Sequence, residues 1–266
     1  MLLAPVQQAP ILPRADGESR LRAFPVESVI SHAVARLRAE RLARSLKPFV
    51  SRGSRSERCP GCRVIPSYCL CAWRPKVEVR AGVCLLMYDV EALKPSNTGW
   101  LIADLVADTH AFGWQRTAVD PRLLALLDDP QYAPCVVFPG EYAEPERVIE
   151  ELPPLAAGKR PLFILLDATW TEARKMFRKS PYLNRFPVLS LKPEQLSRYR
   201  LRRSKRDEHL CTAEVAALCL ELAGEPQAAV ALDAWLDLFT EHYLGAKHRR
   251  VLDEQSPAHQ ALKPFL

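Results

Sequence analysis

The stretch PLFILLDATW at residues 161–170 decides the fold class of this chain. Its first six residues form an apolar run of strand length, and residues 171–179 after it have the apolar spacing of a helix. A continuous apolar strand that leads into a helix is typical of a parallel sheet covered by helices on both faces. The stretch therefore predicts an α/β domain in which Asp167 lies at the carboxyl end of a buried strand.

The same alternation of strand and helix extends along most of the chain. Apolar runs at 82–88, 134–138 and 187–191 predict further strands, and 116–119 predicts a short one. Helical spacing is found at 27–47, 98–110, 121–127, 212–222 and 227–243, and Asp120 is placed to cap the third of these helices. This order of elements predicts one mostly parallel sheet.

Composition excludes several classes of protein. Hydrophobic residues make up 48% of the 266 residues and only 10 are Gly, so an intrinsically disordered or collagen-like chain is excluded. No apolar run approaches the roughly 18 residues that a membrane helix needs. The first 13 residues carry three prolines and no basic residue before Arg14, which does not match an export signal. We therefore expect a cytoplasmic protein with reduced thiols and no membrane partner.

The chain carries 37 Lys and Arg against 31 Asp and Glu, and the excess is unevenly distributed. One basic block lies between Arg36 and Arg58, and a denser one lies between Arg198 and Arg206. Such blocks indicate a polyanionic partner such as RNA, although each alone is also compatible with a solvated basic face. The candidate RNA-binding residues are Arg198, Arg200, Arg202, Arg203, Lys205 and Arg206.

Four of the eight cysteines are crowded into a C-x2-C-x6-C-x-C pattern: Cys59, Cys62, Cys69 and Cys71. Four thiolates at this spacing can surround one tetrahedral ion, and the Pro-Gly turn between the first two directs both sulfurs inward. The pattern predicts a structural zinc site, because four thiolates leave no open coordination position. Two disulfides and an iron–sulfur cluster are the alternatives. The segment 57–75 has few large apolar residues, so a metal would supply much of its folding energy.

Polar and aromatic residues follow the predicted strands at the edge where α/β proteins bind ligands. Asp167 is a candidate general base, Thr169 a helix cap and Trp170 a flat surface for a base or adenine ring. The alternative is that Asp167 only caps the next helix. Ser96, Asn97 and Thr98 at another helix start are suited to bind an anion or a ribose, or only to cap that helix. The chain lacks a G-x-G-x-x-G or phosphate-loop motif, which argues against dinucleotide or nucleoside triphosphate binding.

Taken together and in order, these motifs resemble those of DTW-domain proteins, and most of all the bacterial tRNA-uridine aminocarboxypropyltransferases. The resemblance covers about residues 57–245, and the Asp-x-Thr-Trp signature is intact with Ala168 at its variable position. The motifs that carry it are the four cysteines, Ser96-Asn97-Thr98-Gly99, Asp167-Ala168-Thr169-Trp170, Tyr199-Arg200-Leu201-Arg202-Arg203 and Cys211-Thr212-Ala213-Glu214.

The resemblance implies a fold similar to the knotted SPOUT-like methyltransferases, with S-adenosylmethionine as donor. It implies transfer of the 3-amino-3-carboxypropyl group to N3 of a uridine in tRNA, with release of methylthioadenosine. Asp167, Thr169 and Trp170 are then the expected catalytic residues. The residues expected near the donor are Ser96, Asn97, Thr98, Gly140, Thr212 and Glu214.

The sequence predicts four regions: a leader with a basic helix at 1–56, a zinc-binding segment at 57–75, the DTW α/β domain at 76–245 and a C-terminal tail at 246–266. Two other functions fit the same observations. One is an RNA methyltransferase that uses the same donor, which would differ in the mass that it adds to tRNA. The other is a non-catalytic, zinc-containing RNA-binding module, for which the residues at the strand ends would be incidental.

Overall fold

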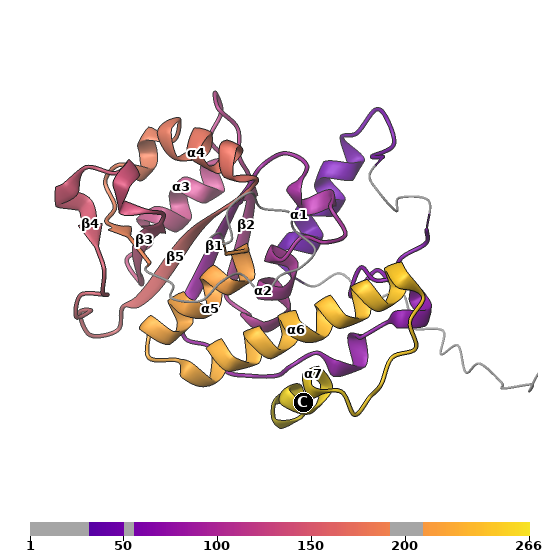
Figure 1. Cartoon of the computed structure of the whole chain (residues 1–266). Helices are drawn as coiled ribbons and strands as arrows, with labels where there is room; N and C mark the ends of the chain where they lie inside the picture. The colour runs from indigo at the N-terminus through magenta and orange to yellow at the C-terminus, as the bar shows by residue number, and fades with distance from the viewer. Residues whose placement is uncertain (1–31, 51–55, 192–209) are drawn as a thin grey trace, which may run out of the picture.

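A computed structural model describes residues 32–50, 56–191 and 210–266. Its centre is a six-stranded sheet in the order β2-β1-β5-β3-β6-β4, and every adjacent pair of strands is parallel. The prediction of a mostly parallel α/β fold is therefore confirmed (Figure 1). The strands are β1 Gly82–Met87, β2 Thr109–Gly113, β3 Tyr132–Val137, β4 Val148–Ile149, β5 Arg160–Asp167 and β6 Val188–Leu189.

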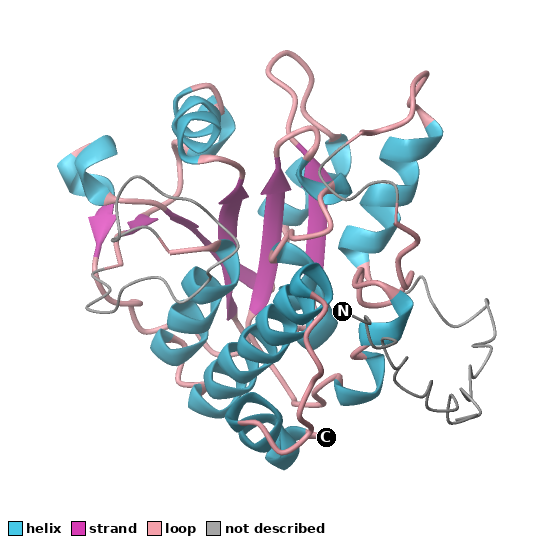
Figure 2. Ribbon diagram, turned by 45° about the vertical axis from the view of Figure 1, so that its right-hand side comes forward, coloured by secondary structure: helices cyan, strands magenta, loops and turns pink. Residues whose placement is uncertain are grey.

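Helices cover both faces of the sheet (Figure 2). Successive side chains of a strand point to opposite faces, so β1 contributes to both layers. Its Cys84 and Leu86 pack with α3 and α4, whereas Val83, Leu85 and Met87 pack with α2, α5 and α6. The helices are α1 Ala33–Ala43, α2 Gly99–Leu105, α3 Pro121–Asp128, α4 Trp170–Arg178, α5 Thr212–Leu222, α6 Pro226–His248 and α7 Pro257–Leu262.

Local sequence signals set where these helices begin. The Asp120 side chain accepts a hydrogen bond from the Arg122 amide, and Pro121 occupies the first turn of α3, as predicted. At α5 the Glu214 carboxylate accepts from the Cys211 amide at 2.7 Å. Each of these contacts satisfies an amide that has no partner within the helix.

Two predicted elements are wrong. The helix expected at 98–110 ends at Leu105, and the strand expected at 116–119 is absent, because the chain forms β2 at Thr109–Gly113 instead. β2 is an edge strand whose register is fixed by pairing with β1, from Val83 opposite Thr109 to Met87 opposite Gly113. Its short sequence, THAFG, has no apolar alternation, so only the partner strand specifies it.

The ends of the described chain pack against the central sheet and its helices. Helix α1 lies against β2 and α2, while residues 27–31 of its predicted range lie outside the described residues. The predicted C-terminal tail contains α7, which buries His259 and Leu262. The division of the chain into four regions stays a prediction. The SPOUT-like knot also stays a prediction, since residues 192–209 between β6 and α5 are outside the described part. Within that part, no helix combines the length and apolarity needed to cross a membrane.

Candidate functional site at the carboxyl edge of the sheet

Asp167 ends β5 and is completely buried. Its Oδ2 accepts a hydrogen bond from Nδ2 of Asn97 at 2.6 Å, and its Oδ1 accepts one from Oγ1 of Thr212 at 2.7 Å. Asn97 lies two residues before the first residue of α2, and Thr212 is the first residue of α5. One carboxylate therefore connects the end of a central strand to the starts of two helices.

The first turns of α2 and α5 also contact each other around this carboxylate. Oδ1 of Asn97 accepts from the Trp100 amide at 3.0 Å, which fixes the orientation of the Asn97 amide group. The Ala213 amide donates to Oγ1 of Thr98 at 3.4 Å. A Cβ atom at Gly99 would lie 2.8 Å from Oδ2 of Asp167, so a larger residue at this position would displace the carboxylate. The packing requires glycine here.

The structure thus brings together four of the predicted site residues, Asp167, Asn97, Thr98 and Thr212. Glu214 is buried nearby on the first turn of α5, and Ser96 is half-buried just before Asn97. The role of Asp167 as a general base stays a prediction. Its zero exposure and its two occupied oxygens favour a positioning role, because a base must reach the proton that it removes.

The other two residues of the Asp-x-Thr-Trp signature lie at the start of α4. Thr169 is the N-cap residue, as predicted, and its amide and hydroxyl both donate to Oε2 of Glu172. The half-buried Trp170 stacks on Phe138 at the end of β3, with ring centroids 5.4 Å apart, and meets Tyr142 edge-on at 5.8 Å. Trp170 therefore belongs to an aromatic cluster that spans the ends of β3 and β5.

Gly140 follows β3 at the same edge of the sheet. Its amide donates to Oγ of Ser190 at 3.0 Å, just after β6. A Cβ atom at position 140 would lie 2.8 Å from Cγ1 of Val148, so this close approach of three chain segments needs glycine. Gly140 is therefore placed two strands away from the end of β1 and beside the strand that carries Asp167.

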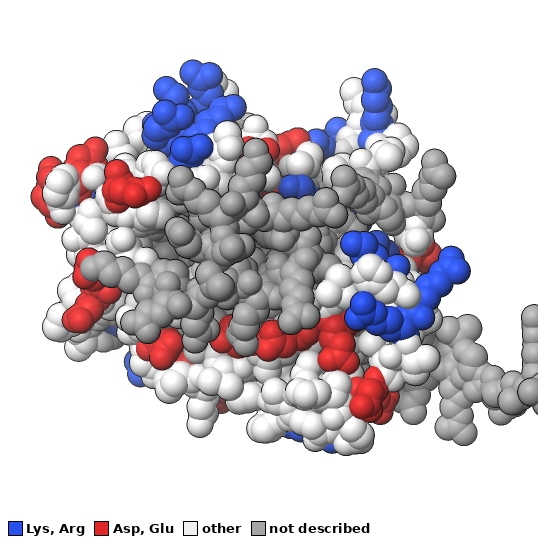
Figure 3. Space-filling model, in the orientation of Figure 1, with Lys and Arg blue, Asp and Glu red and all other residues white. Residues whose placement is uncertain are grey.

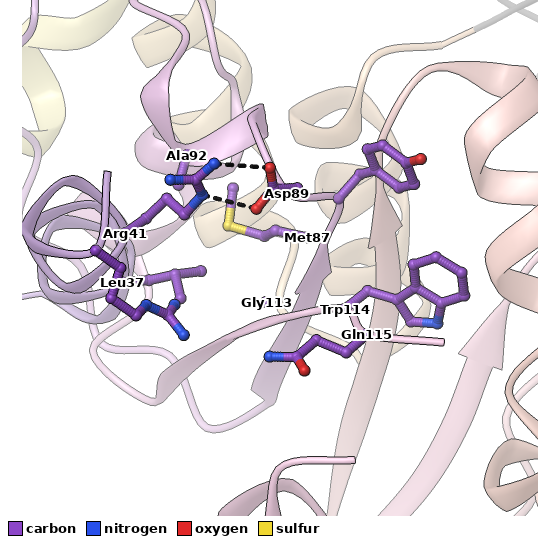
Figure 4. A pocket seen from close by; sticks show the side chains of 10 residues that line it. Leu37, Arg41, Met87, Asp89, Ala92, Gly113, Trp114 and Gln115 are labelled. Carbon is purple, nitrogen blue, oxygen red and sulfur yellow. Dashed lines mark hydrogen bonds and ion pairs between the residues drawn. The ribbon is translucent and has the colours of Figure 1, made fainter. Parts of the chain in front are cut away.

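A cavity of about 310 Å³ opens at the carboxyl ends of β1 and β2 (Figure 4). Tyr88 and Trp114 are stacked in its wall with ring centroids 5.8 Å apart, and Arg41 of α1 forms two hydrogen bonds with Asp89. The Tyr88 amide donates to the Asp167 carbonyl oxygen at 3.0 Å, so the cavity adjoins the Asp167 network. Sequence reasoning did not bring Arg41 and Trp114 to this edge, because they come from separate segments without a motif.

The four clustered cysteines converge in space as predicted. Their sulfur atoms all lie within 4.8 Å of one another, with Cys59–Cys71 and Cys59–Cys69 at 3.5 Å and Cys62–Cys69 at 3.8 Å. A zinc ion with Zn–S bonds of about 2.3 Å requires sulfur separations of about 3.8 Å. All four cysteines are free thiols, so the two disulfides weighed as an alternative are not formed. The donor set and its spacing fit one tetrahedral metal ion.

Contacts with α2 and α6 hold the cysteine segment on the domain. Nε1 of Trp100 donates to the Gly61 carbonyl at 2.9 Å, and Arg74 forms an ion pair with the buried Asp104 at 3.0 Å. The Tyr68 carbonyl oxygen lies 2.9 Å from Nδ1 of His242 on α6. A Cβ atom at Gly61 would lie 2.7 Å from Sγ of Cys71, so glycine permits the close turn around the sulfurs.

One group of positive charges lies over α4. Figure 3 shows a group of Lys and Arg side chains over this helix, among which Lys175, Arg178 and Lys179 are exposed. Nζ of Lys175 also lies 5.9 Å from the ring centroid of Trp114. Trp114 is part of the wall of the cavity at the ends of β1 and β2. The denser block predicted to bind RNA, residues 198–206, lies outside the described residues.

Comparisons with known proteins identify the family. The model of the DTW domain matches residues 56–244. The chain is similar to tRNA-uridine aminocarboxypropyltransferase 2 of Drosophila melanogaster, with 25% identity over 176 residues. That alignment covers 63% of this chain and 66% of the Drosophila protein. No solved structure matches the chain significantly. With the family model covering most of its length, this chain belongs to the DTW domain family.

Proposed function

We propose that this protein transfers the 3-amino-3-carboxypropyl group of S-adenosylmethionine to N3 of a uridine in tRNA. The observation that carries the proposal is the similarity to the Drosophila aminocarboxypropyltransferase within the region of the family match. The arrangement of the sheet edge supports it, since polar side chains from α2, β5 and α5 meet there beside a cavity. α/β proteins bind their ligands at this edge.

The reaction breaks the N3–H bond of uridine and the bond from the γ-carbon of the donor's amino-acid chain to sulfur, forms the bond from N3 to that carbon, and releases the N3 proton to water. The electron pair of the carbon–sulfur bond goes to sulfur, which leaves as the neutral thioether methylthioadenosine. Displacement at the γ-carbon rather than the methyl group requires that N3, carbon and sulfur be in line. Positioning is therefore the main demand on the protein.

The network around Asp167 is suited to that demand. Its three hydrogen-bonded side chains fix the starts of α2 and α5 relative to β5 without any charged partner. We propose that the donor lies against these helix starts and against the turn at Gly140, bordered by Ser96, Asn97, Thr98, Thr212 and Glu214. Trp170 and the stacked Tyr88 and Trp114 offer flat surfaces for the rings of the donor or the acceptor.

Two further groups complete the proposal. We propose that the four cysteines bind zinc as a structural ion, because four thiolates leave no position for substrate. We propose that the basic residues 198–206 and the exposed lysines and arginine of α4 bind tRNA phosphates. A cytoplasmic location remains the prediction from the sequence.

The test uses purified protein, tRNA and S-adenosylmethionine labelled in one of two places. Label in the carboxyl group should pass to tRNA, whereas label in the methyl group should remain in methylthioadenosine. Mass analysis of the nucleosides should then identify aminocarboxypropyl-uridine. Passage of the methyl label to tRNA would instead establish an RNA methyltransferase, and passage of neither label would support a binding module without catalysis.

A further inference from the structure

A second cavity, of about 480 Å³, lies between α1, the cysteine segment and the residues that precede α2. Three arginines line it: Arg38 from α1, and Arg58 and Arg63 from the cysteine segment. Carboxylates are missing from its lining within the described residues. Trp100, at the start of α2, supplies an aromatic wall. The cavity is therefore strongly positive and partly aromatic.

Two of these arginines lack an acidic partner in the described part of the chain. Arg63 is only 6% exposed, its guanidinium lies 5.2 Å from the ring centroid of Trp100, and its Nη1 has no hydrogen-bond partner there. The buried Nε of Arg38 is likewise without a partner among the described residues. Burying donors of a charged group without acceptors is costly, unless a ligand supplies the acceptors.

The metal site explains only part of this positive charge. Arg63 follows Cys62 directly, so thiolates that bind a metal would attract its guanidinium. Arg38 comes from a different element, α1, and is not attached to the cysteine segment. Its charge has no acidic counterpart among the described residues that line the cavity.

We propose that this cavity binds a phosphate group of the tRNA backbone, an inference that rests on the proposed function. Phosphate oxygens accept hydrogen bonds from several guanidinium groups at once, as the convergence of Arg38 and Arg63 allows. RNA is the polyanion that the proposed reaction brings to the protein. The residues of this site belong neither to the basic block 198–206 nor to α4.

The cavity and the Asp167 network share one wall. Leu93, Pro95 and Trp100 line the cavity, while Asn97 in the same segment donates to Asp167. The Trp100 amide is bonded to Oδ1 of Asn97, which ties the two sites together within the first turn of α2. Trp100 and Asn97 are separated by less than one helical turn along the chain. A phosphate held in the cavity therefore places RNA close to Asn97, which contacts Asp167 at the proposed transfer site.

The experiment measures tRNA binding by the full-length, metal-loaded protein without S-adenosylmethionine, over a range of salt concentrations. Arg38→Gln should weaken binding roughly three- to tenfold at low salt and lower the slope of log K against log salt by about 0.7–0.9, the value for one phosphate. Arg36→Gln is the matched control. It removes the same charge from the same helix two residues away, from an exposed position that faces elsewhere.

The inference predicts a clear difference between the two variants, and equal effects on affinity and slope would overturn it. Arg38→Lys, which keeps the charge, should retain most of the affinity, and thermal unfolding checks that each variant folds. The two proposals fail separately. If Arg38→Gln weakens tRNA binding but the protein transfers no aminocarboxypropyl group, the phosphate site stands and the proposed function falls. If transfer occurs but Arg38→Gln binds tRNA like Arg36→Gln, the site falls and the function stands.

Discussion

The cysteine cluster and the Asp167 network are both small polar centres, but they are built in opposite ways. All four cysteines lie within residues 59–71, so their spacing in the chain determines their spacing in space. Asp167 instead joins Asn97 and Thr212, which are 70 and 45 residues away from it. A local pattern thus specifies the first centre, whereas the packing of the whole sheet specifies the second.

The two centres also differ in what stabilises them. The cysteine segment is short, and its two single-turn helices and loops place few large side chains in the core, so the proposed metal would supply much of its folding energy. The Asp167 network lies at the end of β5, whose apolar residues are buried between two layers of helices. Helix α2 and the residues just before it support both centres, through Trp100 and Asp104 of the helix on one side and Asn97 before it on the other.

The largest effect is expected from removal of the metal. Chelation, or Cys62→Ser, should release the bound ion and unfold the segment 57–75, because zinc binding contributes on the order of 10 kcal/mol in small metal-dependent folds. Metal content, a fall in the thermal midpoint and a change in Trp100 fluorescence would report the loss, since Trp100 contacts Gly61.

Cys84→Ala is the control for this comparison, because Cys84 is a fully buried thiol of β1 outside the cluster. It should lower stability modestly and leave the metal content unchanged. A Cys62→Ser protein that keeps its metal and its thermal midpoint would contradict a structural metal site.

The next largest effect is expected at Asp167. Asp167→Ala leaves the buried donors of Asn97 and Thr212 without acceptors, at a cost of about 2–5 kcal/mol in the free energy of unfolding. Asp167→Asn keeps both contacts, with its amide oxygen accepting from Asn97 and its amide nitrogen donating to the Thr212 hydroxyl. Urea unfolding should therefore separate the two variants clearly.

Activity of the same pair distinguishes positioning from base catalysis. A positioning role predicts that Asp167→Asn keeps transfer within a few-fold of the unchanged protein and leaves its pH profile unaltered. A general base predicts a loss of about 10²–10⁴-fold in a variant that is stably folded. The second result would restore the role that the sequence predicted.

The contrast between the centres also explains how far sequence reasoning extends. Strand β5 and helix α5 were predictable because their own residues carry a strong apolar pattern. The observed bounds of α5, Thr212–Leu222, are the same as the predicted range 212–222. The cysteine cluster was predictable from four positions. Strand β2 was not, because an edge strand with the sequence THAFG takes its register from β1 rather than from its own residues.

The candidate site shows the same division. Asn97 and Asp167 were singled out from local signals, at a helix start and at a strand end, whereas Thr212 was expected from the family resemblance. Their meeting on one carboxylate depends on the strand order, which no local pattern contains. The cavities add residues such as Arg38 and Trp114, which become neighbours of the site only through tertiary packing.

The smallest effect is expected at the boundary between the two centres, where Asp104 of α2 pairs with Arg74 of the cysteine segment at 3.0 Å. Burial raises the pKa of Asp104 to about 7, although Arg74 and a hydrogen bond from Trp235 oppose the shift. The folded protein therefore holds this proton up to about pH 7, whereas the unfolded chain releases it near pH 4. Between these two pH values Asp104 is ionised in the unfolded chain but not in the folded protein. The free energy of unfolding therefore falls as the pH rises, by up to about 1.4 kcal/mol per pH unit.

Asp104→Asn cannot ionise, so it should lose this part of the pH dependence. Relative to the unchanged protein, the variant should gain about 1–1.5 kcal/mol of stability in urea unfolding between pH 6 and pH 8. Asp128→Asn removes a charge from an exposed ion pair with Arg185 and should show a nearly constant difference over the same range. A constant difference for Asp104→Asn as well would mean that Asp104 is ionised throughout, held so by Arg74. The cysteine segment would then be joined to α2 by a full ion pair at every pH in this range, rather than by a hydrogen bond from Arg74 to a carboxyl group that ionises only near pH 7.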